Sequence, residues 1–244
     1  MKKLFLVIVG LLSLAVAGSG AFAAPVAKKQ KLVIEAPDLD KIQHDITDPT
    51  SPFYYPKLME RYARNETVMT LDDYRHLYYG AMFQEDFNPY RRSDFTTKNE
   101  SLYYKNTHTR AELDSIIYYA QEALKDDPFD LSQMNYLIYA LRARGKVNRA
   151  NIWQFRLNHL LQAIVSSGTG LDKDHAWYVI NPRHEYNIIN FQNAKALDQQ
   201  YEEPYFDRIE VEKSAGKNGK VTNGTYYFNI RKMLEEYYRK FPEE

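Results

Sequence analysis

The hydrophobic periodicity of residues 109–166 is the feature that most constrains the fold of this 244-residue chain. Thr109 and Glu112 have the spacing of a capping box, which begins a helix. Apolar residues follow at the spacing of one helix face, at Leu113, Ile116, Ile117, Ala120 and Leu124. Pro128 ends this helix, Gly145 ends the next, and a third is expected over about 148–166. The short turns between them predict helical hairpins.

The spacing within residues 112–166 resembles a tetratricopeptide repeat. Ala123, followed by Pro128, matches the end of one unit. Gly145 and Ala150 fall where the next unit has a glycine turn and a small packing residue. The resemblance implies hairpins that present a concave face to a partner.

The chain before residue 109 is predicted to be partly helical. Pro56 and Thr70 each begin a short helix, because proline suits the first turn and threonine caps the backbone amides. Residues 24–51 are expected to form an extended lead-in with a short edge strand at Leu32, Val33 and Ile34. The polar stretch from Asn88 to Thr107 is expected to be a long connection.

After Gly168-Thr169-Gly170 the pattern changes from helical to mainly strand-like. The predicted elements are a strand at 176–180, a short helix at 184–193, strands near 206–211 and 226–230, a hairpin loop over 214–224, and a final helix over 230–241. Helices followed by strands predict an α+β fold: tetratricopeptide-like hairpins, then a small, mostly antiparallel sheet and a C-terminal helix. Residues 52–244 are expected to form a single domain, with a helical part (52–167) and a β-containing part (168–244).

The first 23 residues have the pattern of a cleaved signal peptide. Lys2 and Lys3 precede an apolar run that is shorter than the roughly 20 residues of a membrane-spanning helix. A small-x-small sequence then predicts cleavage between Ala23 and Ala24. The chain has no cysteine, so a lipoprotein anchor is excluded and we expect a periplasmic or secreted protein with no membrane span after cleavage.

Composition excludes several function classes. The balance of 32 basic and 32 acidic side chains argues against a nucleic-acid partner, and a mean hydropathy of −0.59 argues against a polytopic membrane protein. Without cysteine there is no disulfide, thiolate zinc site or cysteine nucleophile. No cofactor and no metal site are predicted.

Tyrosine is over-represented, with 21 residues against 12 Phe and 2 Trp. Twelve of them form adjacent pairs, at Tyr54-Tyr55, Tyr78-Tyr79, Tyr103-Tyr104, Tyr118-Tyr119, Tyr226-Tyr227 and Tyr237-Tyr238. We interpret most pairs as one tyrosine inside the core and its neighbour at the rim. Tyr78, Tyr237 and Tyr238 are expected on the core-facing stripes of their helices.

Several short motifs in combination are similar to a known family. They are Pro52–Tyr62, Leu71–Gly80, Gln84–Tyr90, Gly168–Gly170, His184–Tyr186, Asp207–Val211 and Tyr227–Ile230. Together they resemble domain-of-unknown-function family forty-nine nineteen, exported proteins of Bacteroidetes-type bacteria. The resemblance covers nearly all of the chain after residue 23 and implies export and a single-unit architecture, but no activity.

The sequence offers weak candidates for catalysis at His184, Glu185 and Glu85. A zinc-protease helix needs a second histidine four residues after the first, and that position is Ile188. Glutamate or histidine acting as a general acid or base remains open. The alternative is that His184 and Glu185 are a structural polar pair.

A second candidate is the polar and aromatic segment that begins at Tyr79. Tyr79, Gln84, Glu85 and Tyr90 could line a groove for a sugar or peptide, or the segment could simply end a helix. The leading hypothesis is a non-enzymatic module that binds a peptide, protein or glycan partner. The alternative is an envelope hydrolase that uses glutamate and histidine.

Overall fold

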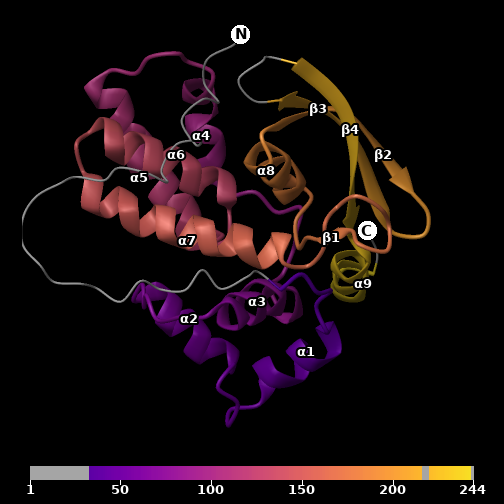
Figure 1. Cartoon of the computed structure of the whole chain (residues 1–244). Coiled ribbons are helices and arrows are strands. Elements are labelled where there is room, and N and C mark those ends of the chain that lie inside the picture. Colours follow the sequence, from indigo (N-terminus) through magenta and orange to yellow (C-terminus); the bar gives the residue numbers. More distant parts are fainter. Residues whose placement is uncertain (1–32, 216–219, 243–244) are drawn as a thin grey trace, which may run out of the picture.

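A computed structural model describes residues 33–215 and 220–242 (Figure 1). The predicted signal peptide and its cleavage site between Ala23 and Ala24 lie outside these residues. Within the described part of the chain, none of the helices is both long and apolar enough to cross a membrane.

The first part of the described chain is helical, as predicted. Its elements are α1 (Leu39–Thr47), α2 (Tyr55–Ala63), α3 (Leu71–Gly80), the 3-10 helix η1 (Ala81–Phe83), α4 (Asp94–Tyr103), α5 (Arg110–Asp126), α6 (Leu131–Ala143) and α7 (Val147–Val165). From α4 to α7 each helix packs against the next in sequence, which makes a stack beside α1–α3 (Figure 1). Similarity of this stack to a tetratricopeptide repeat stays a prediction.

Local sequence explains where these helices begin and end. The side chains of Thr70 and Thr109 form the predicted capping boxes with Asp73 and Glu112. Gly145 follows α6 with a φ of 72°, a left-handed conformation that glycine adopts without strain.

The second part of the chain contains a mixed sheet and two helices. Its elements are β1 (Trp177–Tyr178), α8 (Arg183–Phe191), β2 (Ala194–Glu202), β3 (Phe206–Ala215), β4 (Lys220–Asn229) and α9 (Arg231–Lys240). The described strands lie in the order β1-β4-β3-β2; β1 is parallel to β4 and the other pairs are antiparallel. The predicted α+β class, with a mostly antiparallel sheet and a C-terminal helix, is confirmed.

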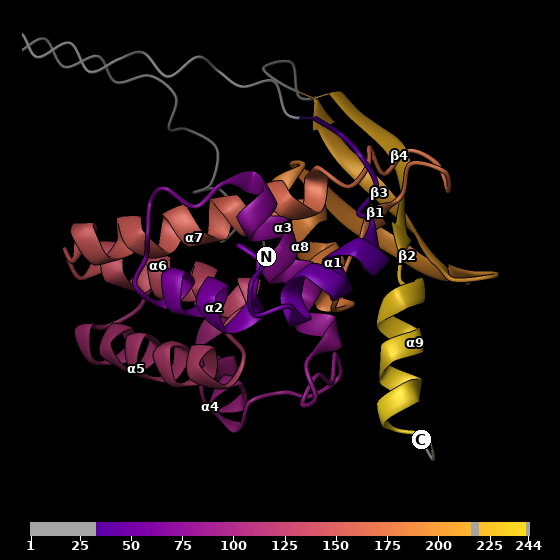
Figure 2. The same cartoon turned by 90° about the horizontal axis from the view of Figure 1, so that it is seen from below.

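Helix α8 lies between the helical stack and the sheet, whereas α9 extends from the end of β4 (Figures 1 and 2). The ammonium group of Lys240 ties α9 back to the helical part, since it donates to the carbonyls of Met82 at 2.7 Å and Gln84 at 2.5 Å.

Two helices lie where the sequence predicted irregular chain. Helix α1 occupies part of the expected lead-in: Asp38 caps it, and Ile42 and Ile46 bury its inner face. The prolines on either side concealed this short helix. Helix α4 occupies part of the expected connection; its sequence has little apolar periodicity, and only its cap Ser93 marks its start.

The sheet also differs from the prediction. Strand β2 was not expected, because its sequence lacks β-branched residues and its strand conformation comes from pairing with β3. The predicted strand at 176–180 is only two residues long, and the loop expected over 214–224 is shorter, since β3 and β4 pair out to residues 215 and 220. Val33 and Ile34 form no strand and are exposed.

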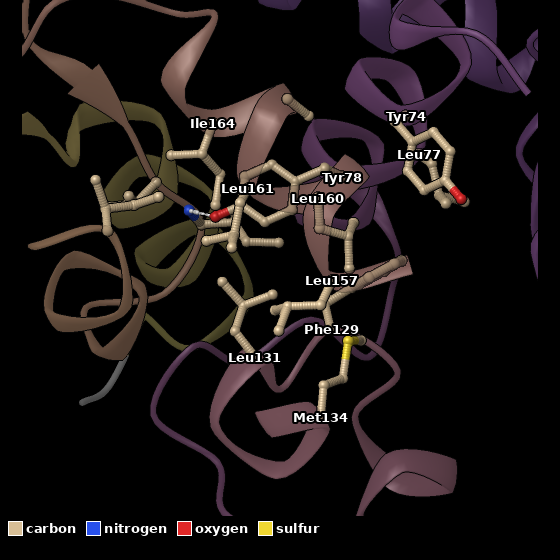
Figure 3. Packing of buried hydrophobic residues seen from close by; sticks show 14 of the residues in the cluster. Tyr74, Leu77, Tyr78, Phe129, Leu131, Met134, Leu157, Leu160, Leu161 and Ile164 are labelled. Atoms are coloured by element: carbon tan, nitrogen blue, oxygen red, sulfur yellow. Dashed lines mark hydrogen bonds between the residues drawn. The ribbon is translucent and has the colours of Figure 1, made fainter. Parts of the chain in front are cut away.

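Buried apolar side chains of the described residues form a continuous core from α1 to α9. Figure 3 shows its centre, where the ring of Tyr78 lies among α7 residues such as Leu161 and Ile164, with Phe129 and Leu131 nearby. The helical and β-containing parts therefore share one core.

Three of the six tyrosine pairs divide as expected. Tyr103, Tyr226 and Tyr237 are buried while the next residue in each pair is more exposed. The prediction for Tyr238 was wrong: it is 55% exposed, because α9 turns only one face toward the core. Tyr78 and Tyr79 are both fully buried.

The Gly168–Gly170 turn positions β1. A side chain at Gly168 would place its Cβ 2.3 Å from the carbonyl oxygen of His175, and the indole of Trp177 donates to the Gly168 carbonyl at 2.9 Å. Gly170 has a φ of 70°, and its Cβ would lie 2.5 Å from the Trp177 ring. The close approach of this turn to the strand requires glycine at both positions.

Replacing Gly170 by alanine should destabilise the protein more than replacing Gly145. Both positions have a positive φ, which costs alanine roughly 1 kcal/mol, but only Gly170 lacks space for a methyl group. We expect the overlap with Trp177 to add roughly 2 kcal/mol to the loss in unfolding free energy. Urea denaturation of both variants measures the difference, and equal losses would contradict this account.

Candidate functional site

The candidate residues His184 and Glu185 are both buried in α8: the exposed fraction is 3% for His184 and 0% for Glu185. Because consecutive residues of a helix point about 100° apart, the two side chains enter different surroundings. The imidazole faces α3 and the turn between α5 and α6, whereas the carboxyl group faces the sheet.

The imidazole of His184 is fully engaged in structural hydrogen bonds. Its Nδ1 lies 2.7 Å from the Tyr78 hydroxyl, which also accepts the Ile180 amide at 3.3 Å (Figure 3 draws the latter bond). Since that hydroxyl oxygen already accepts a hydrogen bond from the Ile180 amide, we assign the Tyr78 O–H as the donor to Nδ1 of His184. The imidazole also hydrogen-bonds to the backbone of Phe129.

Burial, together with the nearby charge of Arg183, lowers the pKa of His184 to about 3. The imidazole is therefore neutral near pH 7. With a neutral ring held between Tyr78 and Phe129, His184 supports the structure rather than acting as a free general base.

Replacing Tyr78 by phenylalanine should cost about 3 kcal/mol of unfolding free energy. The change leaves the Ile180 amide and His184 Nδ1 without this partner in the protein interior. Tyr118→Phe is the matched control, because Tyr118 is exposed on α5 and removal of its hydroxyl group should hardly change the unfolding free energy. Urea denaturation gives both values; a Tyr78→Phe loss as small as the control would show that the hydroxyl is dispensable.

Glu185 forms a carboxyl pair with Asp207, which lies on β3 and is 7% exposed. Burial, reinforced by the charge of Asp207 and a hydrogen bond to it, raises the pKa of Glu185 well above its usual value. Gln199 on β2 donates to Oε2 of Glu185 at 3.3 Å, whereas Oε1 accepts no hydrogen bond from a described residue. These effects favour the protonated form of Glu185, whose O–H then donates a hydrogen bond to Asp207; burial also raises the pKa of Asp207.

Tyrosine hydroxyls lie near this carboxyl pair. Tyr186 donates to Oε1 of Gln199 at 2.5 Å. Burial is the main cause that raises the pKa of Tyr186 and of Tyr90, and the nearby carboxyl pair adds to it. A carboxyl pair with one proton offers both a donor and an acceptor near neutral pH. The sequence interpretation missed Asp207, although its alternation with Ile209 and Val211 places it on the inward face of the strand.

The stability of the protein should fall as pH rises through the range where the folded state keeps the Glu185 proton. Above the usual pKa of 4.5 the unfolded chain releases that proton and the folded chain retains it, so folding becomes less favourable. Glu185→Gln can still donate to Asp207 and lacks this penalty. Its stability relative to the wild type should improve by up to about 1.4 kcal/mol per pH unit.

Urea denaturation from about pH 5 to about pH 9 measures this slope. Glu85→Gln is the control, because Glu85 is exposed and lies outside the carboxyl pair. A constant difference between Glu185→Gln and the wild type across that range would show that Glu185 is ionised when folded.

The four residues of the predicted groove do not form one site. Tyr79 is fully buried, with its hydroxyl 3.4 Å from the carbonyls of Ala163 and Tyr178. Gln84 donates to the Gly80 carbonyl at 3.0 Å, Glu85 is exposed, and Tyr90 packs edge-on against Tyr237 with ring centroids 4.8 Å apart. The segment does end a helix, as the structural alternative proposed.

The same segment nevertheless forms one wall of a pocket, here called the junction pocket. Its volume is about 260 Å³, and it lies between α2, the segment after α3, the turn between α5 and α6, and the chain that leads into α8. Its apolar lining comes from Tyr55, Met59, Ala81, Phe87, Pro89, Pro128, Phe129 and Ile180. Its polar lining comes from Gln84, Asp86, Asn88, Arg91, Ser93, Asp126, Asp127, Asn181 and His184. Glu85 and Glu185 are not among these residues, so the three catalytic candidates do not converge on the pocket.

A wider hollow of about 560 Å³ lies over residues 104–109 and Glu112. It is a depression of one loop against the start of α5. The junction pocket, by contrast, is enclosed by segments that are far apart in sequence, and we therefore take it as the candidate binding site.

Asp127 is the most perturbed acid in the junction pocket. Burial, with the neighbouring charge of Asp130, raises the pKa of Asp127 to about 6. Its Oδ1 accepts the Phe129 amide at 3.0 Å, and its Oδ2 lies 4.0 Å from the guanidinium of Arg183, beyond hydrogen-bond distance.

The described residues contain no group of three or more His, Asp or Glu side chains arranged to hold a metal ion.

Residues 40–239 match the model of the family Domain of unknown function (DUF4919). The chain belongs to this family. No curated protein and no solved structure matches this DUF4919 chain.

Proposed function

We propose that this DUF4919 protein is an exported, non-enzymatic binding module that holds a peptide, protein or glycan partner at the junction pocket. The observation that carries the proposal is the pocket itself, in which apolar walls surround a few polar groups from distant segments. Its volume of about 260 Å³ suits one side chain or one small polar unit of a larger ligand. Export is proposed from the signal-peptide pattern of residues 1–23.

The alternative, an envelope hydrolase, has one observation in its favour. The Glu185–Asp207 pair brings together two carboxyl groups whose pKa values are both raised, an arrangement that acid–base catalysis can use. Glu185 is completely buried, however, and His184 is neutral and engaged. The binding role therefore has more support than the hydrolase.

A ligand that occupies the junction pocket should raise the melting temperature of the protein. A ligand at about 100 times its dissociation constant adds about 2.7 kcal/mol of stability. Thermal unfolding against panels of peptides and envelope glycans identifies the class that binds. Met59 lies on the α2 side of the pocket, so Met59→Trp should fill part of it and abolish the ligand-induced rise in melting temperature.

Lys57→Trp is the matched control, since Lys57 is exposed on the same helix and does not line the pocket. Ligand binding that survives Met59→Trp in a folded variant would place the site elsewhere, and the absence of a shift with every class would contradict a binding role.

A further inference from the structure

The junction pocket has an excess of negative charge. Among the described residues that line it, three are carboxylates, Asp86, Asp126 and Asp127, and one is a guanidinium, Arg91. Arg91 donates to the backbone carbonyl of Asp126 at 3.1 Å, and its single positive charge leaves the lining with a net negative charge. A cationic group would therefore complement the pocket.

The three carboxylates differ in how well their charge is compensated. Asp126 accepts a hydrogen bond from the Ser93 hydroxyl at 2.5 Å, and Asp86 lies in the field of Lys240. Asp127 has a second acid, Asp130, nearby; the guanidinium groups of Arg183 and Arg91 also act on it, but Arg183 lies 4.0 Å from Oδ2, beyond hydrogen-bond distance, and Arg91 donates to the Asp126 carbonyl. Burial is the main cause of the raised pKa of Asp127, and the charge of Asp130 adds to it. A bound cation would therefore gain the most favourable electrostatic interaction at Asp127.

The walls of the pocket suit an apolar chain that leads to this charge. Tyr55 and Met59 on α2, Phe87 on the opposite segment, and Phe129 next to Asp127 give it a hydrocarbon lining. A lysine side chain has this pattern, with a four-carbon stem and a terminal ammonium group that carries three donors. A glutamate or a neutral sugar lacks the complementary charge.

We propose that the junction pocket binds the side chain of a lysine from a peptide or protein partner, with its methylene stem against Met59 and Phe87 and its ammonium group on Asp127. This inference rests on the proposed binding function and names its ligand class.

Capped glycine-rich peptides that differ at one central residue test the proposal directly. The central residue is lysine, acetyl-lysine, norleucine or glutamate, and binding is followed by calorimetry and by amide NMR shifts of Phe129 and Asn181. The lysine peptide should bind roughly tenfold or more tightly than the norleucine and acetyl-lysine peptides, because they lack the ammonium charge. Equal binding of the lysine and norleucine peptides, or tighter binding of the glutamate peptide, would overturn the proposal.

Asp127→Asn removes the charge and keeps an oxygen that can accept the Phe129 amide, so the variant should fold. It should reduce the preference for lysine over norleucine to less than about twofold. Asp114→Asn is the matched control on α5, where Asp114 pairs with Arg144 outside the pocket, and it should keep the full preference. A folded Asp127→Asn variant that keeps the preference contradicts the assignment to Asp127.

The failure of this inference is distinguishable from failure of the binding function. If none of the four peptides binds but a glycan raises the melting temperature and Met59→Trp abolishes that effect, the lysine assignment is wrong and the binding role stands. If neither peptides nor glycans bind, both proposals are wrong.

Discussion

The hydrogen-bonded contact between Tyr78, Ile180 and His184 is the constraint on which the rest of the structure depends. It joins α3 of the helical part to the chain that leads from the sheet into α8, inside a core where an unpaired polar group costs about 1–3 kcal/mol. The Tyr78 hydroxyl comes from α3, whereas the Ile180 amide and the His184 imidazole come from the chain around the start of α8. These bonds therefore fix how the helical part packs against the β-containing part. A similar contact fixes α7 on α2, where Arg156 donates to the carbonyls of Tyr62 and Ala63, each at 2.9 Å.

The position of the junction pocket follows from this contact. Ile180 and His184 belong both to the hydrogen-bonded contact and to the pocket lining, and Phe129, whose backbone binds the imidazole, forms another part of that lining. The turn that carries Phe129 also carries Asp127. The same bonds that hold the two parts of the fold together therefore place the Asp127 carboxylate against the apolar walls of the pocket.

Sequence reasoning predicted the elements whose signals are local and missed those that depend on distant partners. The Thr109 side chain caps the start of one helix and Gly145 ends another, and both helices were predicted from these local signals. Strand β2 has no such signal, because it is a strand only where β3 pairs with it. The segment after Tyr79 was singled out from the sequence, but its contribution to a pocket depends on α2 and the α5–α6 turn, which the sequence does not bring together.

The two ionisable residues of α8 show why a binding function fits this site better than catalysis. Burial lowers the pKa of His184 to about 3 and raises that of Glu185, so in both cases it favours the uncharged form, which a protein interior accommodates at least cost. Both are also held by neighbours, His184 by Tyr78 and Glu185 by Asp207. Asp127, by contrast, keeps a side chain that is 35% exposed and faces a pocket large enough for a side chain. The groups that resemble catalytic residues therefore stabilise the junction, whereas Asp127 presents a partly accessible carboxylate to the pocket and is suited to hold a ligand.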